Sequence, residues 1–143
     1  MQLFDRYIKV TFRNFNQMKS VFTLLLCFSF FSTQAQAREK AVDAFEKADA
    51  VKIGNLMGQD IELSLLNNVE YCSKSKAIAR LKSFFKKYPP RKVSVIHRGA
   101  SKNSDSNFVI AQLNAGSEFF RLYMYAEAHN GTFKLAEIRV ERE

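Results

Sequence analysis

The sequence predicts an α+β domain in which three N-terminal helices pack on a curved antiparallel sheet. Three segments before residue 89 carry apolar residues at helical spacing. From residue 91 onward the apolar residues alternate with polar ones, which is typical of strands. Two hairpin signals, Ala115-Gly116 and Asn130-Gly131, divide that second part. Because the helices come first and most strands follow, the pattern favours an α+β fold over an alternating α/β fold.

The first helix is predicted over residues 38–48, where Phe45 and three alanines recur at a spacing of three or four. Asp49 is the expected N-cap of a short second helix over residues 50–57. Gly58 is the expected end of that helix, because glycine tolerates the backbone conformation that follows a helix.

The third helix is expected to begin at Ser73 or Ser75 and to end at Pro89-Pro90. Its outer face is basic, with Lys74, Lys76, Arg80, Lys82, Lys86 and Lys87. A positive helix can follow phosphates or an anionic membrane surface. We expect a solvated face instead, because most charged runs on helices have that role.

Six strands are predicted, over residues 61–65, 69–72, 91–99, 107–114, 117–127 and 132–141. The first two form a hairpin around Asn67-Asn68. The last four follow one another and are expected to pair antiparallel.

The last two strands are predicted to have one core face and one mixed face. The core face consists of Phe120, Leu122, Met124, Ala126, Ala136, Ile138 and Val140. The mixed face consists of Phe119, Arg121, Tyr123, Tyr125, Phe133, Leu135, Glu137 and Arg139. Aromatic residues and arginine are enriched in protein interfaces. We therefore expect these residues, apart from Leu135, to form an interface, with a homodimer as one candidate partner arrangement.

The N-terminal part of the chain is predicted to be a cleaved secretory signal. Lys19 precedes an apolar run, Val21–Phe31, which is too short to span a bilayer but has the length of a signal-peptide core. The tripeptide Ala-Gln-Ala at 35–37 has the small residues of a cleavage site. A buried core helix is a weaker interpretation, because such a helix seldom combines a basic flank with a small-residue exit.

Met18 is the suspected true start, so that residues 1–17 are an upstream extension or an unusually long n-region of the signal. Lipidation of Cys27 is disfavoured, because Leu26 stands where a lipoprotein signal has a small residue. We expect the upstream extension and signal to cover residues 1–37 and a single exported domain to cover residues 38–143. That domain would be periplasmic or secreted, with no stable membrane span.

Cleavage would lower the formal charge from +8 to +5, leaving 18 Lys or Arg against 13 Asp or Glu. Such an excess is ordinary, so a nucleic-acid partner is not expected. Only Cys72 would remain, which excludes a disulfide within residues 38–143. Because no histidine is near Cys72 in the sequence, we expect a buried, inert thiol rather than a catalytic one.

His97 is the strongest single candidate for catalysis. It alternates with Val93 and Val95 and could point into the interior as a general base. A histidine satisfied at the rim is the more common outcome. The predicted ligand pocket combines His97 with Phe85, Leu122 and Met124.

Other catalytic and cofactor sites are not expected. The predicted core face carries no carboxylate that could serve as a base beside an oxyanion donor. Two histidines without a spacing relation and one cysteine do not predict a metal site. The sequence also has no glycine-rich phosphate loop, and we expect no cofactor.

Three segments resemble the cone-shaped fold of the nuclear transport factor 2-like superfamily, which includes ketosteroid isomerases. They are "AFEKADAVKIGNLMGQDIEL", "SKSKAIARLKSFF" and "FRLYMYAEAHNGTFKLAEIRVE". More narrowly, "YCSKSKAIARLKSFF", "HRGAS" and "LAEIRVE" resemble exported bacterial proteins of domain of unknown function 4783. The resemblance implies the cone fold, an outer sheet that commonly pairs two subunits, and no established activity.

The sequence therefore favours an exported, non-enzymatic module that binds a small apolar ligand or another protein, such as an envelope protein. The alternative is a cone-fold isomerase-like or hydrolase-like enzyme that uses His97. Fold alone does not decide between them, because the same fold carries many functions.

Overall fold

The computed structural model describes residues 33–101 and 105–143. The predicted start Met18, the apolar run Val21–Phe31 and Cys27 lie outside the described residues. The elements in order are α2 (Thr33–Glu46), α3 (Ala50–Leu56), β1 (Met57–Leu65), β2 (Asn68–Ser73), α4 (Lys74–Lys87), β3 (Lys92–Ala100), β4 (Ser106–Ala115), β5 (Glu118–His129) and β6 (Thr132–Arg142). Residues Ala35–Glu143 form one compact unit.

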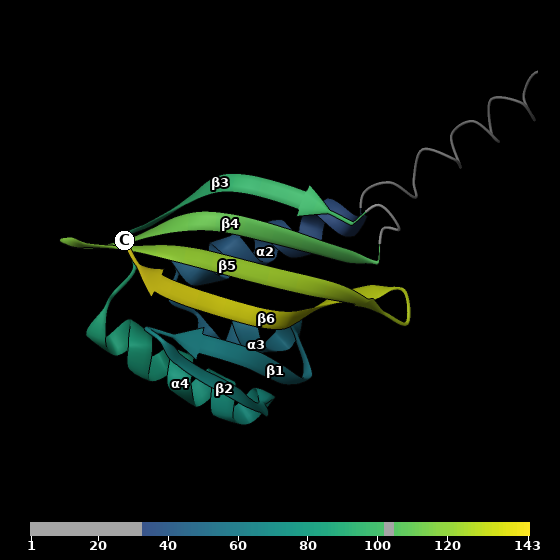
Figure 1. The fold of residues 1–143 in the computed structure, drawn as a ribbon, viewed down its shortest axis with the longest axis horizontal. Helices are drawn as coiled ribbons and strands as arrows, with labels where there is room; N and C mark the ends of the chain where they lie inside the picture. The colour runs from purple at the N-terminus through teal and green to yellow at the C-terminus, as the bar shows by residue number, and fades with distance from the viewer. Residues whose placement is uncertain (1–32, 102–104) are drawn as a thin grey trace, which may run out of the picture. The chain divides into compact units, whose positions relative to one another are not determined.

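The six strands form one sheet in the order β2-β1-β6-β5-β4-β3. Four neighbouring pairs are antiparallel, while β1 and β6 are parallel. In the view of Figure 1, α2 and α3 lie behind the strands, and α4 lies beside β2 at one edge of the sheet. The predicted α+β architecture, with helices on one face of a curved sheet, is confirmed. Among the described residues, no helix combines the length and the apolar character needed to cross a bilayer.

The N-cap of α3 is the predicted one, but both neighbouring helix ends differ from the prediction. The Lys52 N–H donates to Asp49 Oδ1 at 2.9 Å, as expected of a cap. The first helix ends at Glu46 rather than at residue 48. The second helix ends before Met57, whose side chain is buried and which already has extended backbone angles. The helix therefore ends one residue earlier than predicted, where the chain enters β1. Gly58 lies within that strand and does not end the helix.

The core lies between the helices and the sheet and contains a chain of packed aromatic rings. The Phe85 ring is 5.7 Å from Phe45 on α2, and the Phe84 ring is 5.5 Å from Phe120 on β5, both edge-on. Tyr88, just after α4, packs 5.0 Å from Phe120. These contacts join α2, α4 and β5 into one hydrophobic core.

Bulges interrupt the alternation of side chains between the two faces of the sheet, at positions that the sequence pattern does not indicate. Tyr125 pairs with Glu137, but the next residue of β5 pairs with Leu135, so Ala136 is the extra residue. One extra residue shifts the alternation, so the side chains before it take the faces opposite to those expected from the residues after it. The predicted facing of this segment is therefore wrong, because Leu135 is buried in the core and Phe133 lies on the same side of the sheet as Leu135.

Candidate functional site

Core packing fills the positions at which the sequence predicted a ligand pocket. Phe85, Leu122 and Met124 are 6%, 0% and 3% exposed. All three belong to the hydrophobic core, where they contact other apolar side chains. Met124 also borders a shallow hollow on the opposite face of the sheet.

His97 lies on the face of the sheet opposite to the helices. Val95 pairs with Ala111, but His97 pairs with Ile110, so Ile96 is the extra residue of a bulge. The prediction that His97 shares a face with Val93 and Val95 is therefore wrong. The imidazole is exposed, and its ring centre lies 5.5 Å from that of Phe108.

The outer face of the sheet carries a strip of aromatic and charged side chains that we call the outer strip. It consists of Phe108, Ile110, Phe119, Arg121, Tyr123, Tyr125, Glu137 and Arg139. The register places them in rows across β4, β5 and β6: Phe108 beside Tyr125 beside Glu137, and Ile110 beside Tyr123 beside Arg139. Six of the predicted interface residues belong to it, and Phe133 does not.

Two members of the outer strip, Phe108 and Ile110, were missed by the sequence analysis. Their alternation with the buried residues Val109 and Ala111 was the available signal. Gly99 on β3 makes room for the Phe108 ring, since a Cβ at that position would lie 2.2 Å from ring atoms.

A hollow of about 180 Å³ lies in the middle of the outer strip. Its lining includes Phe108, Ile110, Tyr123, Tyr125, Glu137 and Arg139. No described helix covers this face, so these rings are half-buried only by their neighbours in the sheet.

Ion pairs within the chain fix the charged members of the outer strip. An Arg139 guanidinium nitrogen lies 2.7 Å from Glu137 Oε1. Arg121 Nε and Gln112 Nε2 donate to the carboxylate of Glu143 at 2.6 Å and 2.5 Å. The hydrogen bond from Gln112, then that from Arg121, lowers the pKa of Glu143. Both arginines are thus held in position on the sheet surface.

A larger groove of about 520 Å³ begins where the outer strip ends. It forms because β1 has extra residues between Met57 and Glu62, which separate it locally from β6. Tyr71, Tyr125 and four carboxylates line it, contributed by Asp60, Glu62, Glu127 and Glu137. The described residues include no group of three or more side chains suited to hold a metal ion.

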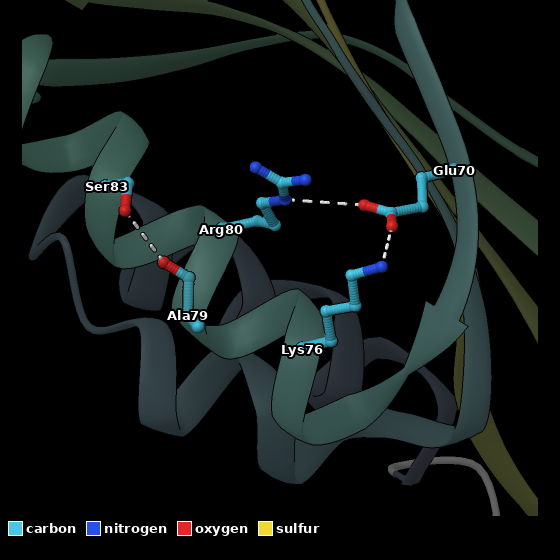
Figure 2. Close-up of polar contacts among 5 residues, drawn as sticks. All are labelled: Glu70, Lys76, Ala79, Arg80 and Ser83. Carbon is cyan, nitrogen blue, oxygen red and sulfur yellow. Dashed lines mark hydrogen bonds and ion pairs between the residues drawn. The ribbon is translucent and has the colours of Figure 1, made fainter.

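Glu70 ties the edge strand β2 to the basic helix α4. Figure 2 shows its carboxylate between Lys76 and Arg80, with which it forms ion pairs. The Arg80 Nε–Glu70 Oε2 distance is 3.3 Å. The hydrogen bond from Lys76 is the largest effect that lowers the pKa of Glu70. Burial and the nearby Glu70 charge raise the pKa of the Cys72 thiol, which disfavours the reactive thiolate.

Replacing Glu70 with Gln should lower the free energy of unfolding at neutral pH but not in acid. The pKa of Glu70 is lowered in the fold relative to about 4.3 for an unfolded chain. The charged group therefore stabilises the fold above that value, and the effect is lost as the pH falls through the folded pKa. Urea unfolding of both proteins at a series of pH values measures the difference.

The effect of Glu70→Gln should be small, because the ion pair lies at the surface, where the side chains of Lys76 and Glu70 are 54% and 24% exposed. Glu46→Gln, which removes an exposed carboxylate of α2, is the matched control. A difference between wild type and Glu70→Gln that stays constant down to strongly acidic pH would contradict the expectation.

The layout of helices on one face of an open, curved sheet defines a nuclear transport factor 2-like, or cystatin-like, fold. An uncharacterised cystatin-fold protein from Novosphingobium aromaticivorans matches with a TM-score of 0.59 and 12% identity, covering 77% of this chain and 98% of that one. A candidate ketosteroid isomerase from Kribbella flavida matches with a TM-score of 0.53 and 16% identity, over 76% of each chain.

The chain belongs to the family described as domain of unknown function DUF4783, whose model matches residues 38–141. A DUF4783 protein from Bacteroides uniformis has a similar structure, with a TM-score of 0.69 and 21% identity over 73% of this chain and 95% of that one. A search of curated proteins gives no match. At these identities the solved structures share the fold, and the function is argued from the site.

Proposed function

We propose that this domain is a non-enzymatic association module that pairs with a second copy through the outer strip. One observation carries the proposal: a sheet face without a covering helix holds four aromatic rings together with two arginines. A solvated sheet face normally alternates to small polar or charged residues. Contiguous apolar patches of this kind usually mark a contact surface.

The positions of His97 and of the predicted pocket residues argue against the enzymatic alternative. His97 lies on the exposed outer face, away from the apolar interior in which a general base would act. Leu122 and Phe85 are part of a filled core, so these interior positions hold side chains instead of substrate. The likeness to a candidate ketosteroid isomerase concerns the fold only.

An arrangement about a twofold axis fits the outer strip. Tyr123 and Tyr125 would meet their own copies near the axis, as an isologous contact requires. Glu137 and Arg139 neighbour them and can satisfy each other in one chain or across the axis. A specific contact of this type should bury roughly 1,200–2,000 Å² in total.

Light scattering of the purified protein over a wide concentration range tests the proposal. We expect a dimer mass at micromolar concentrations. A monomer mass at the highest soluble concentration would remove the self-association, and the outer strip would then need a different protein, such as an envelope protein, as its partner.

We also propose that the domain is exported after cleavage behind Ala37. Ala41 and Phe45, which α2 contributes to the hydrophobic core, follow that position. The DUF4783 match also begins at residue 38. Removal of residues 1–37 would thus leave these core residues of α2 in the domain.

Mass spectrometry of the protein from the cell-envelope fraction should find Arg38 at the N-terminus. The physical reason is the order of Lys19, the apolar run and the small-residue site at 35–37. Replacing Ala37 with a large residue such as Phe should block this cleavage, whereas Gln36→Phe should not. A protein that retains Met1 or Met18 in the soluble cytoplasmic fraction would contradict export.

A further inference from the structure

One stretch of this chain is basic throughout. Residues 71–104 contain ten Lys or Arg and no Asp or Glu. Carboxylates from outside the stretch form ion pairs with three of them, Lys76, Arg80 and Arg98. The neutralised residues lie toward the first half of α4 and the far end of β3, so the remaining charge is unevenly distributed.

The remaining charge is concentrated at the end of α4 and the start of β3. We call this group the basic patch; it consists of Lys82, Lys86, Lys87, Arg91 and Lys92. All five side chains are exposed. The ion pairs found among the described residues include none of them.

Backbone contacts fix the two halves of the basic patch relative to each other. The Tyr88 N–H donates to the Phe84 carbonyl at 2.8 Å and closes α4. After two prolines, the Arg91 N–H donates to the Asn114 carbonyl at 2.8 Å and begins β3. Figure 1 shows the end of α4 and the start of β3 at the same end of the sheet.

The carboxylates at this end of the sheet are largely engaged elsewhere. Glu118 lies 3.3 Å from an Arg142 guanidinium nitrogen. Glu143 accepts from Arg121 and Gln112 on the outer face, and Glu141 neighbours Arg121 in the sheet register. Glu118 and Glu143 thus form ion pairs with arginines outside the basic patch.

Helix stability accounts for only part of this concentration of charge. Lys86 and Lys87 lie in the last turn of α4, where cations interact favourably with the helix dipole. Lys82 and Lys86 are four residues apart, a spacing at which like charges repel. Arg91 and Lys92 lie beyond the helix and gain nothing from its dipole.

We propose that the basic patch binds the domain to an anionic phospholipid surface. Four of its five residues are lysines, which carry compact, hydrated charges on flexible stems. Such charges suit headgroups that change position, whereas planar guanidinium groups favour fixed bidentate partners. The basic patch lies on α4 and the start of β3, and the outer strip lies on β4, β5 and β6, so this proposal does not depend on self-association.

Sedimentation with vesicles tests the proposal on residues 38–143, which include the whole DUF4783 match over residues 38–141. The vesicles contain phosphatidylglycerol and phosphatidylcholine in equal parts, or phosphatidylcholine alone. Each lysine near an anionic surface contributes roughly a fivefold gain in binding, so Lys82→Gln, Lys86→Gln and Lys87→Gln together should weaken it about a hundredfold. Raising the salt from about 0.1 M to about 1 M should release the wild type.

The matched control replaces Lys40, Lys47 and Lys52 with Gln, which changes the net charge equally but on α2, the turn after it and α3. It should bind within about fivefold of the wild type, and circular dichroism should show all variants folded. Equal loss in both triple variants, equal binding to phosphatidylcholine alone, or no binding at low salt would overturn the proposal. So would tighter binding to duplex DNA than to the anionic vesicles.

Discussion

Tyr123→Glu should convert the dimer into a folded monomer. Tyr123 lies between Ile110 and Arg139 in the sheet register, at the centre of the outer strip. Because Arg139 already pairs with Glu137, a carboxylate there would be buried in the contact without a cation of its own, which costs on the order of 3 kcal/mol. Dimer dissociation should therefore become easier by more than about a hundredfold. Light scattering gives the mass, and circular dichroism shows whether the fold is kept.

Tyr71→Glu makes the same chemical change on the same face of the sheet but outside the outer strip. Tyr71 is 76% exposed on the edge strand β2, separated from β5 by two strands. This variant should remain dimeric. Loss of the dimer in both variants would point to a general effect of added negative charge, and a dimer that persists in Tyr123→Glu would place the contact elsewhere.

Phe120→Ala should have the largest effect on stability. Phe120 is fully buried and packs against Phe84 and Tyr88 at ring distances of 5.5 Å and 5.0 Å. Removing the ring loses its transfer free energy and leaves a cavity between α4 and the sheet, at a cost of about 3–5 kcal/mol. Because domains of this size are stable by about 5–15 kcal/mol, much of the total would be lost.

Phe119→Ala is the matched control, because Phe119 is the preceding residue and points to the other face, where it is 43% exposed. Its loss should cost less than about 0.5 kcal/mol in a monomer. Both substitutions are best compared by urea unfolding in the Tyr123→Glu protein, so that self-association does not add to the measured stability. Equal costs would show that the assignment of the two faces is wrong.

The element types and the facing of β5 could be predicted from the sequence for a physical reason. Helix and strand types follow from periodicity and local caps, and Asp49 indeed caps α3. The inward facing of Leu122 and Met124 was also predictable, because β5 pairs with β4 without interruption. Regular alternation holds there over ten successive partners, so each side chain takes the face that its position implies.

The errors lie where the alternation of the sheet is interrupted. The extra residues Ile96 and Ala136 reversed the expected faces of His97 and Phe133. A bulge depends on how a strand matches its neighbour in space, and neither segment carries a local signal such as glycine at that position. The parallel pairing of β1 with β6 joins residues more than 70 positions apart, and no local pattern encodes it.

The bulge at Ile96 also affects how copies of this protein can meet without polymerising. β3 is an edge strand, and an edge with a regular row of free amide and carbonyl groups invites further strands to add. The extra residue breaks that row, and Lys92 and Arg98 place charge along it. The opposite edge, β2, has six residues and is attached to α4 through Glu70. With both edges protected, assembly through the sheet face would stop at a closed pair and would not continue into a fibre.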